Sequence, residues 1–391
     1  MISVADALTH LFALTKQLPV ETVPLSRANG RTLAAPVSAN RDQPPFSASA
    51  MDGYAIVAEG VEPGKSYEVI GEAAAGHAFE GSVTAGQAVR IFTGAPVPEG
   101  ADRVIIQEDV TRERDTITVS DNLDKGLHIR PLGGDFKVGQ TIAAPRVLRP
   151  SDIALMASMN IAEVPVTRRP NVAILSTGDE LVMPGETPGP DQIIASNSFG
   201  LQAMLRDAGC EARLLPIARD TRASLEAAFD LMDDADLLIT IGGASVGDHD
   251  LVGDVAQDLG MQRSFYKIAM RPGKPLMAGT LANGAMMIGL PGNPVSAMVC
   301  GQVFVLPVMR AMLGLGERQT PRIPAILETA MPQNGPREHY MRAHVEHGKL
   351  SLFNNQDSSL LSILSDANAL LVVPPNAPQW PAGTSVEYIP I

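Results

Sequence analysis

The chain has 391 residues, of which 45% are hydrophobic, so it is long enough to form more than one buried core. Its formal net charge of −13 argues against a general binder of nucleic acid or anionic membranes, although local basic residues could still bind an anionic ligand. Its two cysteines, Cys210 and Cys300, are too few for a disulfide framework or a thiolate metal site. No apolar run approaches the length of a membrane span, and the N-terminus lacks a signal-peptide pattern, so a reducing, cytoplasmic compartment is expected.

The N-terminal segment predicts an amphipathic helix from Ser3 to Leu18, with Ser3 as its N-cap and Pro19 ending it. A second helix is predicted over 151–159, with Ser151 as its cap. We expect the two helices to pack together in a discontinuous helical linker domain formed by residues 1–41 and 136–167.

Residues 42–135 read as a small β domain, because short β-rich runs alternate with glycine and proline at 67–70, 88–92, 103–107 and 116–119. Three loops in this domain carry polar residues: Met51-Asp-Gly-Tyr54, Thr93-Gly-Ala95 and Arg130-Pro-Leu-Gly-Gly-Asp135. Each loop taken alone is typical of an ordinary turn.

Strands and helices alternate through residues 168–317. Strands are expected at 172–176, 212–217, 237–241, 276–278 and 286–290, and helices at 198–208, 222–232 and 295–312. This order predicts a doubly wound, mostly parallel sheet with helices on both faces. In such sheets ligands bind outside the carboxyl ends of the strands.

The central strand of this domain is followed by a glycine-rich turn that contains Gly242, Gly243 and Gly247. A helix is expected to begin at about Asp248, with Asp248 as its N-cap. A strand, a glycine turn and a helix start present backbone N–H groups to an anion. The alternative is a glycine-rich turn that binds nothing.

Charged residues also gather at the predicted strand ends. Four are carboxylates without a nearby set of His or Cys residues, and oxygen ligands of this kind suit Mg²⁺: Asp179, Glu180, Asp220 and Asp250. Three are cations that can neutralise phosphate or oxyanion charge: Lys267, Arg271 and Lys274. A single carboxylate could equally cap a helix or carry a surface charge, but the whole set predicts a Mg²⁺–phosphate site.

Residues 318–391 predict a C-terminal β domain with one helix at 360–366. On an alternating strand His344 faces away from His339 and His347, so these histidines cannot share a metal ion. Ser358 is expected either to cap the helix or to contact a ligand.

Taken in order, these loops resemble the molybdopterin molybdenumtransferase family, which includes MoeA and the E domain of gephyrin. The resemblance is carried by eight stretches that span nearly the whole chain: Ala28-Asn-Gly-Arg-Thr-Leu-Ala34, Met51-Asp-Gly-Tyr-Ala55, Thr93-Gly-Ala95, Arg130-x-x-Gly-x-Asp135, Ser176-Thr-Gly-Asp-Glu-Leu181, Gly242-Gly-Ala-Ser-Val-Gly247, Arg271-Pro-Gly-Lys-Pro275 and Leu290-Pro-Gly-Asn-Pro-Val-Ser296. Each stretch is weak alone, and the ordered set is specific. Gly134 stands where the family often has an acidic residue, and Arg271 where some members have Lys.

The resemblance implies an elongated homodimer of four-domain chains, with a MogA-like α/β domain and a C-terminal β-barrel-like domain. It implies Mg²⁺-dependent insertion of molybdenum from molybdate into adenylylated molybdopterin, with release of AMP. The adenylyltransferase and apo-molybdoenzymes are the other expected partners. The implied catalytic residues are Asp52, Glu180, Asp250, Lys267 and Lys274. The implied substrate-binding residues are Thr93, Arg130, Asp135, Gly242, Gly243, Ser245, Gly247, Arg271, Pro291, Asn293, Pro294 and Ser358. The β-domain residues Asp52, Thr93, Arg130 and Asp135 are expected to act from the partner chain.

Two other functions stay open at this point. A molybdopterin adenylyltransferase would need only the α/β domain, and the flanking regions 1–166 and 320–391 argue against it. A scaffold or receptor-binding protein like the E domain of gephyrin would need an exposed peptide groove, which a sequence does not reveal.

Overall fold

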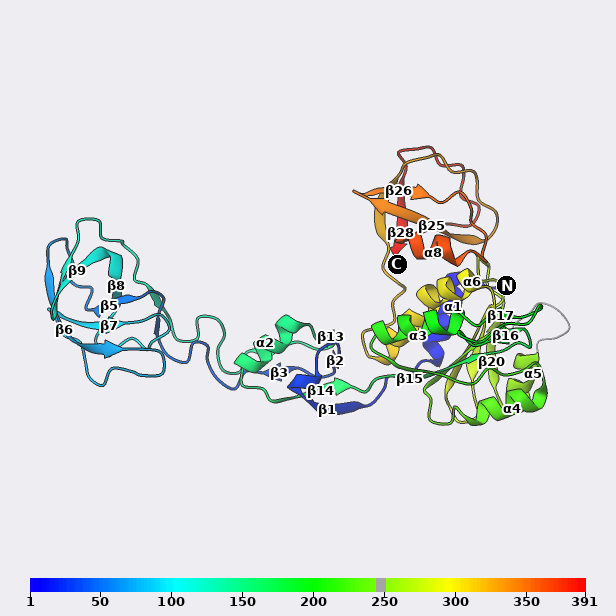
Figure 1. The fold of residues 1–391 in the computed structure, drawn as a ribbon, viewed down its shortest axis with the longest axis horizontal. Coiled ribbons are helices and arrows are strands. Elements are labelled where there is room, and N and C mark those ends of the chain that lie inside the picture. The colour runs from blue at the N-terminus through cyan, green and yellow to red at the C-terminus, as the bar shows by residue number, and fades with distance from the viewer. Residues whose placement is uncertain (244–250) are drawn as a thin grey trace. The chain divides into compact units, whose positions relative to one another are not determined.

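The computed structural model describes residues 1–243 and 251–391. By its internal contacts the chain divides into two units, one formed by 1–21, 30–34 and 166–391 and the other by 22–29 and 35–165 (Figure 1). Each unit has its own hydrophobic cores.

A six-stranded sheet lies at the centre of the larger unit. Its strand order is β18 (Glu211–Leu214), β15 (Asn171–Ser176), β19 (Leu237–Ile241), β23 (Met286–Leu290), β22 (Met277–Thr280) and β20 (Gln262–Tyr266). The first four strands are parallel, whereas β22 and β20 pair antiparallel. The prediction of a doubly wound, mostly parallel sheet is therefore confirmed.

Helices cover both faces of this sheet because successive strand residues point to opposite sides. On one face Ile174 and Ile239 join a core with α1 (Val4–Leu14), α3 (Asn197–Asp207) and a continuous helix formed by α6 (Pro294–Cys300), the π-helical segment Gly301–Val305 and α7 (Leu306–Met312). On the other face Leu175 and Leu238 join a core with α4 (Arg222–Asp230) and α5 (Leu251–Asp258). Figure 1 shows these two helices together on one side of the sheet.

The N-terminal helix α1 does not pack against α2 (Pro150–Ser158), so the predicted pairing of these two helices is wrong. Its capping is as predicted, because the Asp6 N–H donates to Ser3 Oγ at 3.0 Å and Ser3 N–H donates back to the Asp6 carboxylate at 3.3 Å. Leu8 and Leu11, however, lie in the core of the α/β sheet and not against α2 (Pro150–Ser158). Strands β20 and β22 at that end of the sheet need apolar cover, and α1 supplies it.

One helix among the described residues, 294–312, is long and apolar enough to cross a membrane, and most of it is buried inside the protein. The prediction that no apolar stretch reaches this length is therefore wrong. The apolar side chains of this helix, such as Phe304 and Val308, are buried in the core of the larger unit.

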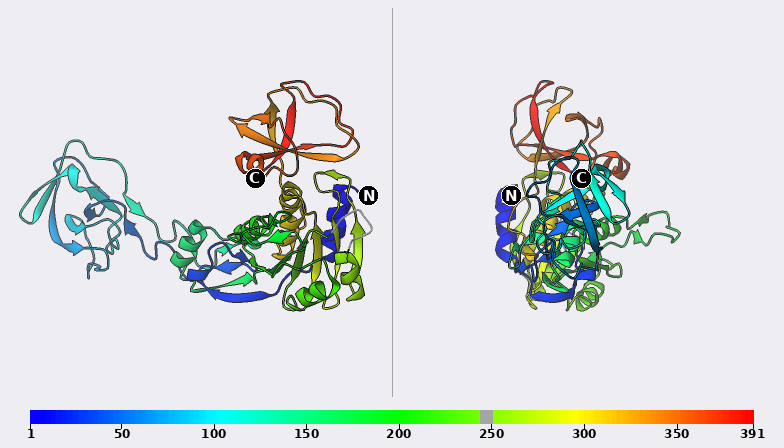
Figure 2. Two further views of the ribbon diagram at one scale, coloured as in Figure 1. Left: turned by 45° about the vertical axis from the view of Figure 1, so that its right-hand side comes forward. Right: turned by 90° about the vertical axis from the view of Figure 1, so that its left-hand side faces the viewer.

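The C-terminal strands form a closed five-stranded barrel, drawn in orange and red in Figure 2. The order is β25 (Glu338–Glu346), β26 (Lys349–Leu352), β24 (Ile323–Leu327), β28 (Ser385–Pro390) and β27 (Ala369–Val373), and pairing of β25 with β27 closes it. The short strand β21 (Met270–Arg271) of the α/β region pairs with β25, and α8 (Leu361–Asp366) follows β26. His339 and His344 lie on β25, and the described residues contain no group of three or more His, Cys, Asp or Glu side chains that could hold a metal ion.

The smaller unit is built on a second six-stranded sheet. Its order is β8 (Arg103–Ile106), β5 (Gly53–Ile56), β7 (Gln87–Ile91), β6 (Ser66–Ala73), β10 (Thr116–Val119) and β9 (Val110–Glu113). The short elements of both units that have not yet been named are β1 (Val20–Pro24), η1 (Leu25–Arg27), β2 (Thr32–Leu33), β3 (Val37–Ser38), β4 (Ala48–Ser49), η2 (Gln107–Asp109), β11 (Ile129–Arg130), β12 (Thr141–Ile142), β13 (Arg146–Val147), β14 (Glu163–Thr167), β16 (Leu181–Val182) and β17 (Ile193–Ile194).

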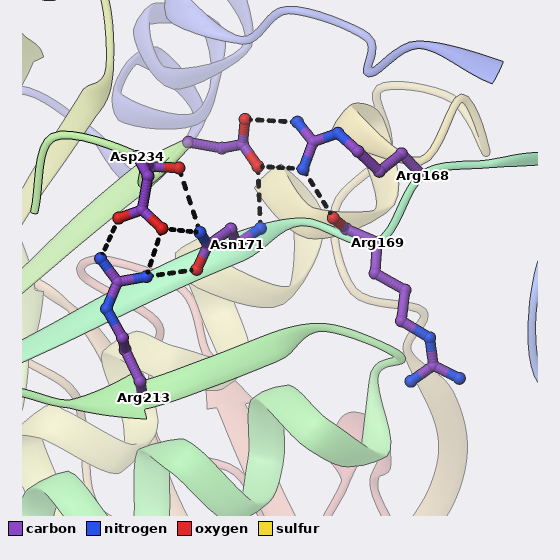
Figure 3. A network of polar contacts seen from close by, with 6 residues as sticks. Arg168, Arg169, Asn171, Arg213 and Asp234 are labelled. Carbon is purple, nitrogen blue, oxygen red and sulfur yellow. Dashed lines mark hydrogen bonds and ion pairs between the residues drawn. The ribbon is translucent and has the colours of Figure 1, made fainter. Parts of the chain in front are cut away.

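A polar network joins the starts of β15 and β19 (Figure 3). Arg168 donates to both carboxylate oxygens of Asp236, at 3.0 and 2.7 Å, and the Asn171 N–H donates to the same carboxylate at 2.8 Å. The hydrogen bonding of Arg168 to Asp236 raises the pKa of the Arg168 guanidinium. Arg213 makes an ion pair with the more exposed Asp234 on the other side of Asn171.

Replacing Asp236 by Ala should lower the free energy of unfolding by about 2 kcal/mol, because a mostly buried carboxylate with charged and main-chain donors is lost. Urea unfolding measures this change. Asp234→Ala is the matched control in the exposed part of the network and should cost less. Equal losses for the two variants would contradict the role given to Asp236.

Candidate functional site

A cavity of about 990 Å³ opens at the carboxyl ends of the parallel strands β15, β19 and β23. Its wall is formed by the turns that follow these strands and includes Thr177, Glu180, Gly243 and Asn293. The carboxyl ends of parallel strands meet at one edge of a sheet, which explains why segments far apart in the sequence line one cavity.

The glycine turns are held to one another by main-chain hydrogen bonds. The Thr177 N–H donates to Ile241 O at 3.0 Å, and the Gly242 N–H donates to Leu290 O at 3.2 Å. Gly242 has a φ of 91°, and a Cβ there would lie 2.7 Å from Thr177 O, so only glycine fits. Because its N–H is already bonded, Gly242 shapes the turn and does not offer that donor to an anion.

Two predicted carboxylates, Glu180 and Asp220, lie near each other in the cavity wall and form its acidic corner. Asp254 of α5, which was not predicted, also lines the cavity. Burial raises the pKa of Asp220, and the negative charges of Asp179 and Glu180 raise it further. Asp179 does not line the cavity; its carboxylate accepts from the Asp220 N–H at 3.3 Å.

Several predicted residues fall within 244–250, outside the described residues. They are Ser245, Gly247, Asp250 and the expected helix cap Asp248. The helix that follows is described from Leu251 onward.

The predicted cations lie on one loop, 267–276, that is fixed by distant parts of the chain. Lys267 adopts a left-handed φ of 70°. The Ile2 N–H donates to Lys267 O at 3.2 Å, and the Ala269 N–H donates to Ile2 O at 2.8 Å. Within the loop, the Ile268 N–H donates to Lys274 O at 3.0 Å.

The side chains of this basic loop do not form the cavity wall. Only Pro275 of the loop lines the cavity, whereas Lys267, Arg271 and Lys274 do not. None of the three makes an ion pair within the described part of the chain, and Lys267 Nζ lies 4.8 Å from the centre of the Tyr266 ring. Their charges are therefore not neutralised by described carboxylates.

The C-terminal region contributes to the cavity through the loop before α8. Asn293 Nδ2 donates to Ser358 Oγ at 3.1 Å, and the Val295 N–H donates to Ser358 O at 3.1 Å. Ser359 lines the cavity, as do the predicted Pro291, Asn293 and Pro294. The N-cap of α8 is Leu360, so of the two roles expected for Ser358 the capping of this helix is wrong.

Sequence reasoning missed Arg342, which is buried on β25 with 1% of its surface exposed. Its Nη1 donates to Leu360 O at 3.0 Å and its Nη2 donates to Asn355 O at 3.4 Å, so it holds the loop that carries Ser358. Burial lowers its pKa. The signal was available, because Arg342 is in phase with the buried Tyr340.

In the smaller unit, the three loops singled out by sequence meet around β4. The Thr93 N–H and Oγ1 both donate to the Asp52 carboxylate at 2.7 Å, and these bonds lower its pKa. The Gly94 N–H donates to Ser49 O on β4, and Arg130 on β11 pairs with β4. Asp135 lies on the same loop as Arg130, and its main-chain N–H donates to Gln43 O at 2.9 Å.

His339 lies opposite Arg271 where β21 pairs with β25. Burial lowers its pKa to about 4, with added effects from Arg271, Arg337 and Arg342. The unfolded chain, with a His pKa near 6.5, binds more protons between pH 6.5 and 4, so stability should fall as the pH drops through this window.

We expect this loss to reach about 1–2 kcal/mol, after allowing for the partial exposure of the ring, and His339→Asn to remove it. Urea midpoints at pH 7 and pH 4.5 test it. His347→Asn, at a fully exposed position, is the control. An unchanged pH dependence in His339→Asn would show that other groups cause the loss.

Comparison with family models gives three matches along the chain. They are the MoeA N-terminal region (domain I and II) over residues 2–160, a probable molybdopterin binding domain over 173–311, and the MoeA C-terminal region (domain IV) over 324–391.

Full-length relatives give the same result. Molybdopterin molybdenumtransferases from Nostoc sp. and Haemophilus influenzae are each 36% identical over 96% of this chain, and over 90% and 96% of their own length. Two crystal structures of a molybdopterin biosynthesis MoeA protein from Pyrococcus horikoshii, 28% and 27% identical, cover all of this chain and 99% and 100% of theirs, with TM-scores of 0.85 and 0.84. The chain belongs to the molybdopterin molybdenumtransferase family.

Proposed function

We propose that the protein inserts molybdenum from molybdate into adenylylated molybdopterin and releases AMP in a Mg²⁺-dependent step. The observation that carries this proposal is the cavity at the carboxyl ends of β15, β19 and β23, which is lined by turns that carry the family motifs. Family membership supports the chemistry, because curated relatives of similar length are named for this transfer.

The two carboxylates of the acidic corner suit Mg²⁺, which is commonly held by one or two carboxylates together with substrate phosphates and water. Burial and neighbouring negative charge raise the pKa of Asp220, a strain on the ionised form that a bound cation would relieve. Glu180 and Asp220 would hold the ion, with Asp179 beside them and Asp250 as a further candidate from the sequence. When bound, Mg²⁺ would neutralise phosphate charge and polarise the phosphoanhydride.

The chain's own residues would do the remaining work. Lys267, Arg271 and Lys274 would attract molybdate and the phosphate oxygens, and would stabilise charge on AMP as it leaves. Asn293, held by Ser358, would fix the turn that closes the cavity on the side of the C-terminal region. The proposed reaction needs no covalent enzyme intermediate, so no nucleophile is assigned.

The test is turnover by the purified chain. With adenylylated molybdopterin, molybdate and Mg²⁺, AMP should appear together with a cofactor that activates an apo-molybdoenzyme. Adenylylation of molybdopterin from ATP, without AMP release from the adenylylated form, would instead support an adenylyltransferase. Tight binding of a receptor peptide by a chain without turnover would support a scaffold.

We also propose that the active form is a homodimer in which the Asp52 loops act on substrate held by the partner chain. Asp52, already fixed by Thr93, lies among three loops that carry family motifs. If Asp52→Ala and Lys274→Ala chains are each inactive, mixing them should restore about one working site per mixed dimer. Mixed dimers that form and stay inactive would contradict a site shared between chains.

A further inference from the structure

A second cavity of about 520 Å³ adjoins the first one. Helices α3 and α6 form one wall, and α8 with the end of the C-terminal barrel forms the other. The lining is mainly apolar, with Met204 and Met298 on the first wall and Leu361 and Leu364 on the second. All four side chains are half-buried, so they can contact a ligand.

Two glycines make room for the two methionines. A Cβ on Gly200 of α3 would lie 2.9 Å from Met298 Sδ, and a Cβ on Gly301 would lie 2.9 Å from Met204 Sδ. Helices α3 and α6 therefore meet through thioethers placed over glycine backbone. Thioether side chains are flexible and make favourable contacts with aromatic rings.

The two cavities are neighbours, because Ser196 and Asn197 line both. Asn197 Nδ2 donates to Gly292 O at 2.7 Å, which anchors this residue to the turn after β23. The polar cavity, with its acidic corner, therefore lies beside an apolar one, and these two polar residues belong to the wall of each. A ligand with charged groups in the first cavity could place a flat apolar part in the second.

We infer that the second cavity is a subsite for a planar nitrogen heterocycle of the substrate. This inference rests on the proposed function, whose substrate carries two such rings, adenine and the pterin, on either side of its phosphates. The volume lies in the range of small-ligand pockets. Methionine and leucine cover the ring faces, and Ser196, Asn197, Gln302 and Ser365 supply polar partners for ring nitrogens and carbonyls at the edge.

The test is to fill the cavity and measure which ligand is lost. Leu361→Trp and Leu364→Trp place bulk in it from α8, and Leu231→Trp, at the exposed C-cap of α4, is the control. The probes are AMP, free neopterin and inorganic pyrophosphate. Filling the cavity should weaken AMP or neopterin at least tenfold and leave pyrophosphate unchanged, and the weakened probe identifies the ring.

A second measurement uses the unmodified protein. Peroxide oxidation of Met204 and Met298, followed by mass spectrometry, should be slowed by the same heterocycle and not by pyrophosphate. Oxidation unaffected by either ring, or filled variants that bind AMP and neopterin as the unmodified chain does, would overturn the subsite. Failure of the proposed function would look different, because the unmodified chain would then show no turnover, whereas loss of the subsite alone leaves turnover normal in the filled variants.

Discussion

Lys274→Ala should raise the dissociation constants of AMP or molybdate about 10–100-fold, which corresponds to roughly 1.5–3 kcal/mol for a lost charged hydrogen bond. Lys274 adjoins the cavity-lining Pro275 and makes no ion pair within residues 1–243 and 251–391. Its carbonyl, not its side chain, accepts from the Ile268 and Leu276 N–H groups, so the loop should keep its shape in the variant. Calorimetric titration with each anion measures the change.

Two controls separate a binding role from a general effect of charge. Lys274→Arg keeps the positive charge and should retain most of the affinity. Lys349→Ala removes an exposed lysine from the C-terminal barrel and should change neither constant. Unaltered dissociation constants for both anions in Lys274→Ala, with an unaltered melting temperature, would retire this assignment.

Local patterns predicted strands well where an apolar run was bounded by turn residues. The strands 116–119, 237–241 and 286–290 have the predicted bounds. Helix ends were harder, and α1 stops at Leu14, four residues before the predicted end. Thr15 is already extended, and no glycine or proline in the sequence marks that position.

The turns of the candidate site could be predicted because topology alone brings them together. Parallel strands β15, β19 and β23 end at one edge, so their turns must share a cavity. The basic loop could not be placed in this way. Its position depends on pairing with Ile2 and with β25, which are contacts between segments remote in sequence.

The same limit explains the partners that sequence reasoning missed. An amphipathic helix such as α1 shows which of its faces is apolar but not which surface that face covers. Alternation along β25 could place Arg342 on the same face as Tyr340, but it could not show that carbonyls of the 355–360 loop accept its protons. Only the folded chain reveals those acceptors.

The largest effects are expected for Glu180→Gln and Asp220→Asn, which remove charge from the acidic corner while keeping size. If these carboxylates recruit Mg²⁺, each variant should release AMP more slowly, on the order of 100-fold, and require about 10–100-fold more Mg²⁺. The raised pKa of Asp220 allows a second test of this role. Because its ionised form is disfavoured in the folded chain without metal, Asp220→Asn should not lower the melting temperature. Turnover at varied Mg²⁺ and thermal unfolding without Mg²⁺ measure both effects.

Asp254→Asn provides the comparison, since Asp254 lines the same cavity from the first turn of α5. A carboxylate there stabilises the helix dipole by roughly 0.3–1 kcal/mol without any metal. Its loss should lower the melting temperature slightly and leave turnover normal. Normal turnover of Glu180→Gln and Asp220→Asn at limiting Mg²⁺ would remove the metal role from both, and Asp179 would then be the next carboxylate to replace. A lowered melting temperature in Asp220→Asn would show that its charge stabilises the fold, contrary to the direction of its pKa.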